Sequence, residues 1–128
     1  MALMYLLDTN IFLEILLSQE KSNVCKTFIN SHYHEIFISD FSLHSIGVIL
    51  FRHKKHNIFN EFLSDVISKI RILNLPSSEY LKLFLPVTKY ELDFDDFYQY
   101  IIAKYYDLQV VTMDSDFKKI KDIKVNFL

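Results

Sequence analysis

The sequence predicts an α/β protein of three layers, in which helices cover both faces of a mainly parallel central sheet. Two observations support this fold class. Short apolar runs, typical of buried strands, alternate along the chain with longer segments whose apolar residues recur at helical spacing. The length of 128 residues is that of one domain, and the 51% of apolar residues can fill a sizeable core.

The first half of the chain begins with an apolar run that Asp8 ends, as expected of a strand buried on both faces. Asp8, Thr9 and Asn10 offer cap chemistry before a helix, and Ser39 and Asp40 offer it before another. The elements expected in order are a strand over residues 3–7, helices over residues 11–17 and 21–31, a strand over residues 36–38 and a helix over residues 40–52.

The second half repeats this alternation. It begins with the clearest helical pattern of the chain, in which Phe59, Phe62, Leu63 and Val66 follow the i, i+3, i+4 rule. The expected elements are a helix over residues 57–70, a strand over residues 70–75, a helix from Ser77 that Pro86 should kink or shorten, a helix over residues 93–106, a strand over residues 109–112 and a weak strand over residues 123–128.

The composition and the distribution of charged residues exclude some classes of protein. No apolar run reaches the roughly 18 residues of a membrane span, and residues 1–7 lack a basic leader, so we expect a soluble, cytoplasmic protein without membrane partners. A net charge of −2 argues against nucleic-acid binding through overall positive charge. It does not exclude a nuclease in which a bound cation meets the phosphate.

Three aspartates stand where a parallel sheet would bring them together. Asp8 ends the first strand, Asp114 ends a later strand, and Asp96 lies in the first turn of the helix before that strand. The carboxyl ends of parallel strands share one edge, where ligands bind. Clustered carboxylates repel one another unless a divalent cation neutralises them, and oxygen ligands favour Mg²⁺ or Mn²⁺.

Each of these acids also has a purely structural interpretation. Asp8 could be a helix cap, the acids at residues 93, 95 and 96 could complement a helix dipole, and Asp114 and Asp116 could form turns. Taken singly, each acid fits the structural interpretation better. Their joint placement after strand ends favours a metal site.

The segments LLDTNIFLEILL and LDFDDFYQYIIAKYYDLQVVTMDSDF resemble the first motif and the second half of the PIN-domain family, and their order, spacing and length match over nearly the whole chain. The resemblance, in particular to VapC-like toxins, implies one PIN-like domain over residues 1–128. It further implies a metal-dependent endoribonuclease that hydrolyses RNA phosphodiester bonds with Mg²⁺ or Mn²⁺. A small antitoxin partner and a homodimer are also implied.

By position, Asp8, Asp96 and Asp114 match the metal-binding acids of the family, and Asn10 and Thr112 match polar residues that orient them. Asp116 matches an accessory acid, and Asp93 and Asp95 lie close enough to Asp96 to exchange places with it in the alignment.

His44 stands where the family has a glutamate in its third helix. A histidine there implies weaker Mg²⁺ binding and a preference for Mn²⁺, or a PIN-like module that binds RNA or protein without catalysis. The structural alternative is a histidine that caps or packs its helix. A receiver-like protein would also place aspartates at strand ends, but it needs a lysine near the sheet edge for which we find no convincing candidate.

Two further groups are expected to be structural. Five aromatic residues near the last long helix lie mostly on one helical face and predict core packing rather than base stacking; they are Phe97, Tyr98, Tyr100, Tyr105 and Tyr106. The basic residues 52–56 are expected to be a solvated helix end rather than an RNA-binding site.

Overall fold

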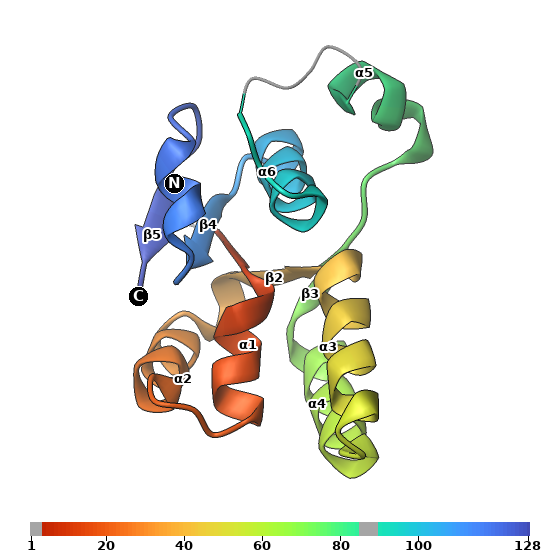
Figure 1. Ribbon diagram of the computed structural model, residues 1–128, viewed down its shortest axis with the longest axis vertical. Helices are drawn as coiled ribbons and strands as arrows, with labels where there is room; N and C mark the ends of the chain where they lie inside the picture. The colour runs from red at the N-terminus through yellow and green to blue at the C-terminus, as the bar shows by residue number, and fades with distance from the viewer. Residues whose placement is uncertain (1–3, 85–89) are drawn as a thin grey trace.

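The computed structural model of the protein describes residues 4–84 and 90–128, apart from the side chain of Ile67 (Figure 1). The prediction that Pro86 kinks a helix and the expected start of the first strand at Leu3 lie outside the described residues. None of the described helices is long and apolar enough to cross a membrane.

The elements follow the predicted order with small changes at their ends. They are β1 (Tyr5–Leu7), α1 (Thr9–Leu16), α2 (Ser22–Ser31), β2 (Ile36–Ser39), α3 (Asp40–Arg52), α4 (His56–Lys69), β3 (Arg71–Leu73), α5 (Tyr80–Phe84), α6 (Phe94–Tyr106), β4 (Gln109–Thr112) and β5 (Val125–Phe127). Short 3₁₀ turns cover Tyr33–Glu35, Ser77–Glu79 and Ser115–Lys119. The helix expected from Ser77 therefore begins as a 3₁₀ turn.

The five strands form one parallel sheet in the order β3-β2-β1-β4-β5. The first strand thus lies in the middle, and the strand order reverses between β1 and β4. In their register Leu7 faces Val111, and the Asp8 backbone N–H donates to the Val111 carbonyl at 2.9 Å. The residues that follow these two strands are therefore neighbours at the carboxyl edge of the sheet.

Alternate strand residues enter opposite cores, as the pleat of a strand requires. Leu7, Ile38 and Val111 pack in the core that α1, α2, α3 and α4 share, whereas Leu6 and Val110 pack against α6. Figure 1 shows α1 to α4 on one side of the sheet and α5 and α6 on the other. The structure confirms the predicted three-layer α/β/α fold.

The aromatic residues of α6 are mostly packing residues, as predicted. Tyr98 and Tyr100 are buried, and Phe97 and Tyr106 pack partly buried against the same core. Tyr105 is the exception, because 43% of it is exposed. The buried face of α6 is thus rotated from the predicted one, and Tyr98 belongs to it in place of Tyr105.

Candidate metal centre

An acidic cleft of about 430 Å³ opens at the carboxyl ends of β1 and β4, where the strand order reverses. Such switch points are where open parallel sheets bind ligands. Its lining residues are Asp8, Thr9, Asn10, Leu13, Phe41, Ser45, Ile49, Phe94, Asp95, Asp96 and Asp114. Among these described residues there are four carboxylates and no lysine, arginine or histidine.

Asp8 directly follows β1, caps α1 and is 5% exposed. One of its carboxylate oxygens accepts from the Thr9 backbone N–H at 2.8 Å, and the other accepts from the Thr112 hydroxyl at 2.8 Å. Burial raises the pKa of Asp8, and the hydrogen bonds from Thr112, Thr9 and Gln99 oppose that rise. The carboxylate is therefore fixed in direction at the base of the cleft.

Thr112 links the two acids that end neighbouring strands. Its hydroxyl donates to Asp8 and accepts from the Asp114 backbone N–H at 2.9 Å, and its side chain is fully buried. The orienting role that the sequence predicts for Thr112 would act through these two hydrogen bonds.

Asp96, Asp114 and Asp116 each offer a carboxylate oxygen, and these three oxygens lie within 4.8 Å of one another. Asp96 is 6% exposed. Burial, followed by the negative charges of Asp95, Asp8, Asp114 and Asp116, raises the pKa of Asp96 to about 7. A donor set made only of carboxylate oxygens suits Mg²⁺ or Mn²⁺. The residues present therefore fit such an ion.

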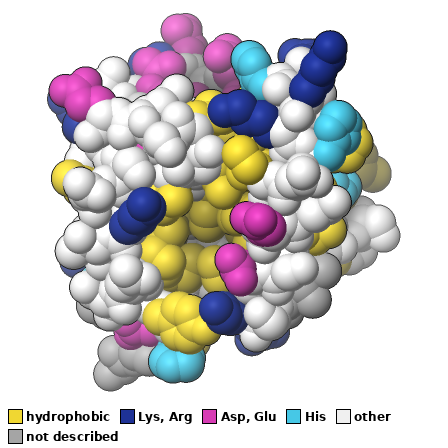
Figure 2. Space-filling model, turned by 90° about the horizontal axis from the view of Figure 1, so that it is seen from below, with side chains coloured by type: hydrophobic (Ala, Val, Ile, Leu, Met, Phe, Trp, Pro, Cys, Tyr) yellow, Lys and Arg dark blue, Asp and Glu magenta, His cyan; other side chains and the backbone are white. Residues whose placement is uncertain are grey.

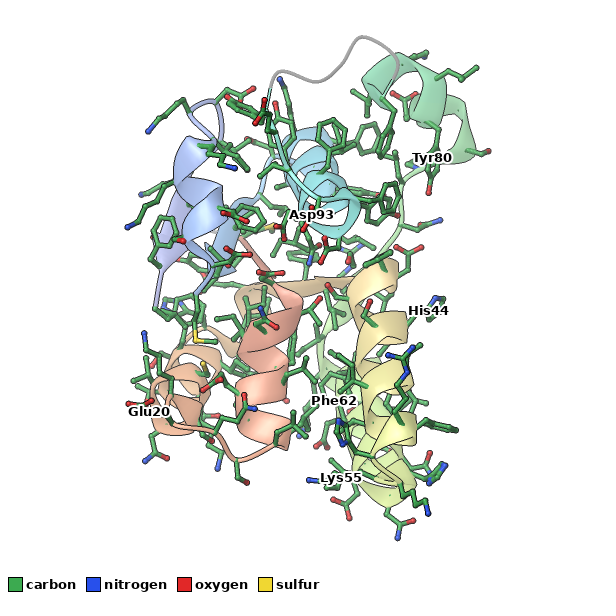
Figure 3. All side chains as sticks on the ribbon, in the orientation of Figure 1. Glu20, His44, Lys55, Phe62, Tyr80 and Asp93 are labelled. Atoms are coloured by element: carbon green, nitrogen blue, oxygen red, sulfur yellow. The ribbon has the colours of Figure 1, made fainter. Side chains whose placement is uncertain are left out.

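The remaining predicted residues divide into two groups. Asn10 is exposed in the cleft, and Asp116 lies beside Asp114, whose carboxylate accepts from the Asp116 backbone N–H at 2.9 Å. Asp95 also lines the cleft. Asp93 precedes α6 as an exposed residue without a side-chain capping bond and is not among the lining residues (Figure 3).

The expectation that His44 faces the cleft is wrong. His44 is exposed, and its side chain points away from α1 on the outer side of α3 (Figure 3). Ser45 lines the cleft instead. Successive residues of an α-helix differ by about 100° in direction, so an alignment shifted by one residue exchanges a cleft residue for a solvated one. The third helix therefore contributes Ser45 to the cleft where His44 was expected from the sequence.

Two buried polar residues beneath the cleft were missed. Gln99 is 1% exposed and donates from Nε2 to Ser42 Oγ, which also accepts from the Thr9 hydroxyl at 2.8 Å. Gln99 Oε1 has no hydrogen-bond partner among the described residues. The available signal was a glutamine inside the apolar run of residues 97–103, because a polar residue on a buried helix face needs polar partners.

Comparisons with known proteins agree with this geometry. Residues 5–123 match the family described as PIN domain. No curated protein matches the chain.

Among solved structures, the chain is similar to VapBC2 from Rickettsia felis bound to a DNA fragment from its promoter, with 17% identity, a TM-score of 0.79 and coverage of 98% of this chain and 99% of that one. A toxin–antitoxin complex from Klebsiella pneumoniae matches with 20% identity, a TM-score of 0.73 and coverage of 93% and 94%. VapC20 of Mycobacterium tuberculosis, described as a toxin that cleaves the sarcin–ricin loop, matches with 14% identity, a TM-score of 0.70 and coverage of 89% and 92%. At these identities the likeness concerns the fold alone.

The different directions of Ser45 and His44 yield a paired test. Ser45→Glu adds a carboxylate to the cleft and should strengthen Mg²⁺ binding on the order of tenfold, because affinity for hard cations rises with ligand charge. His44→Glu adds the same group to the outer side of α3 and should leave the affinity unchanged. Isothermal titration calorimetry with Mg²⁺ on both variants measures this. Equal strengthening by the two variants would contradict the helix register seen here.

The raised pKa of Asp96 predicts how stability depends on pH. An aspartate in the unfolded chain titrates near 3.8 and Asp96 in the folded protein near 7, so the folded state binds more protons between these values. Without metal, this group therefore makes stability fall as pH rises from about 4 to 7. Thermal unfolding in EDTA should show a smaller fall for Asp96→Asn than for the wild type. Identical pH profiles would mean that Asp96 ionises as freely as in the unfolded chain.

Proposed function

Because this chain belongs to the PIN domain family, we propose that it is a metal-dependent endoribonuclease that hydrolyses RNA phosphodiester bonds and is the toxin of a toxin–antitoxin pair. The observation that carries the proposal is the convergence of Asp8, Asp96, Asp114 and Asp116 at the carboxyl edge of the sheet. Residues 1–128 would act as one PIN-like unit.

Several side chains of the cleft would together hold the cation. Thr112 holds the Asp8 carboxylate and the Asp114 backbone in place, and Asp96 must lose its proton to become a ligand. A bound Mg²⁺ or Mn²⁺ would supply positive charge for the phosphate and lower the pKa of an attacking water. The buried Asp8 carboxylate is already held by hydrogen bonds from Thr9 and Thr112, so it would meet the ion without reorienting, which favours binding.

A separate apolar groove supports the proposal of a protein partner. It has a volume of about 330 Å³ and lies between α1, α2 and α4, where Phe12, Ile15, Ile29, Ile58 and Phe62 are among its lining residues. Figure 2, seen from below, shows apolar side chains gathered in a hollow of this face. Apolar hollows of this kind accept the apolar face of an amphipathic helix.

We propose that the antitoxin inserts such a helix into the groove. Two of the structurally similar proteins are a VapBC2 assembly and a toxin–antitoxin complex. Helix α1 separates the groove from the acidic cleft, because Phe12 and Leu16 line the groove while Asn10 and Leu13 line the cleft. A partner helix held in the groove would therefore be separated from the cleft by α1, and only a further segment of the partner that passes around α1 would cover the acids.

The second candidate is a PIN-like module that binds RNA or protein without cleaving it. The observation in its favour is Ser45, which leaves α3 without a carboxylate in the cleft. Both candidates allow RNA binding, but only the first cleaves the RNA. Cleavage by the purified protein therefore separates them.

For the nuclease, Asp8→Asn should lower the rate of RNA cleavage on the order of a hundredfold, because it removes a charge that helps to hold the ion. The assay uses single-stranded RNA with Mg²⁺, Mn²⁺ or EDTA, and EDTA should abolish cleavage. The control is Asp107→Asn, which changes an aspartate outside the cleft at a left-handed position that asparagine tolerates. Cleavage that persists in EDTA would contradict the proposal, and RNA binding without any cleavage would support the second candidate.

For the partner, Ile58→Glu should weaken the complex with the antitoxin at least tenfold, because it places a charge in the apolar groove. The ligand is the product of a short open reading frame adjacent to the gene, and calorimetric titration measures affinity. Val48→Glu is the control, since Val48 is exposed on α3 and does not line the groove. Equal affinities for both variants would place the partner elsewhere.

A further inference from the structure

We propose that Phe94, with Phe41 beside it, forms a subsite that stacks one nucleobase of single-stranded RNA next to the phosphate held in the acidic cleft. That the ligand is RNA rests on the proposed function. It adds a recognition element that the metal-binding acids do not provide.

Phe94 is an apolar ring in an unusual place. It is the first residue of α6, it is 57% exposed, and it lines the cleft together with Asp8, Asp95 and Asp96. A large apolar side chain gains stability when it leaves water. A ligand with a flat apolar face would provide that gain in the cleft.

Neighbouring rings hold Phe94 in one orientation. Phe84 and Tyr98 stack on it, with centroid distances of 5.9 Å and 6.1 Å and interplanar angles of 21° and 20°. Phe41 meets it edge to face at 5.7 Å, and Tyr80 stacks on both Phe84 and Tyr98. Tyr80 is the first residue of α5 (Figure 3). An exposed ring fixed in this way loses little conformational entropy when a ligand covers it.

The chemistry of the cleft selects the ligand. Its described lining contains four carboxylates and no cationic side chain, so the protein alone repels a phosphate chain and only a bound cation attracts it. The ring, in contrast, attracts a planar base without any charge. A nucleotide joins a phosphate to a planar apolar group, and it therefore fits the acids and the ring of this cleft together.

The proposed ligand is a single strand because a base in a duplex is already stacked between its neighbours. Aromatic side chains that bind unpaired bases do so with little preference for sequence, since every base has a π face. The subsite should therefore favour unpaired RNA over paired RNA. It should add affinity without strict base specificity.

The test combines protein variants with abasic RNA. The probe is a fluorescein-labelled single-stranded RNA hexamer, accompanied by a series in which one nucleotide at a time is abasic. Binding is measured by fluorescence anisotropy in Ca²⁺, which accepts the same oxygen ligands, and cleavage by initial rates in Mg²⁺. Phe94→Leu should weaken binding of the intact hexamer on the order of tenfold, the typical effect of one base–aromatic stack. Phe94→Tyr should retain it.

One abasic position should weaken binding to the wild type by a similar factor and have no further effect on Phe94→Leu, because both changes remove the same contact. The matched control is Tyr105→Leu, which changes an exposed ring near the other end of α6 and should leave RNA binding unchanged. Thermal unfolding checks that every variant folds.

Other results overturn the subsite. The subsite is rejected if Phe94→Leu and every abasic position weaken binding independently of each other. It is also rejected if Phe94→Leu binds RNA as the wild type does but changes the oligomeric state in light scattering, because Phe94 would then be a protein contact. The nuclease proposal fails separately. A wild-type protein that shows the coupling but cleaves nothing retains the subsite and loses the enzyme, whereas cleavage unaffected by Phe94→Leu retains the enzyme and loses the subsite.

Discussion

The hydrogen bond from the Thr112 hydroxyl to the buried Asp8 carboxylate joins the carboxyl ends of β1 and β4. Asp8 can remain in the interior only because Thr9, Thr112 and Gln99 compensate its lost hydration. The same Thr112 hydroxyl fixes the backbone at Asp114. One side chain thus sets the positions of acids that are far apart in the sequence, and the strand order β2-β1-β4 makes this contact possible.

The cleft is a compromise between stability and function. Burial, and after it the charges of the neighbouring carboxylates, raises the pKa of Asp96 to about 7, so without a cation an ionised Asp96 opposes the fold. The two cores on either side of the sheet must provide enough stability to hold the acids together. Functional sites of enzymes often carry such a cost, which their ligand removes. Ser45 carries no charge, so the cleft lacks the additional repulsion that a carboxylate at this position would cause.

The strands and the convergence of the acids at one sheet edge were predictable from the sequence, because they depend on patterns that extend over many residues. The residue that α3 contributes to the cleft was not, because it depends on the rotation of a single helix. Apolar runs that end in Asp8 and Asp114 reveal buried strands, and parallel pairing then brings their ends to one edge. His44 was misplaced because an apolar pattern as broad as that of α3 allows a rotation of one residue, and a serine carries no signature of a site. Ser42 and Gln99 could not be paired from sequence, since their contacts are between elements distant in the chain.

The central place of β1 has a consequence for synthesis on the ribosome. Strand β1 pairs on one side with β2, which follows it closely in sequence, and on the other with β4, which lies much further along the chain. Contacts between such distant segments form late in folding. A nascent chain can therefore complete the half of the sheet around β1, β2 and β3 and still lack Asp96 and Asp114. The acidic centre is therefore complete only after β4 and the residues that follow it have been made.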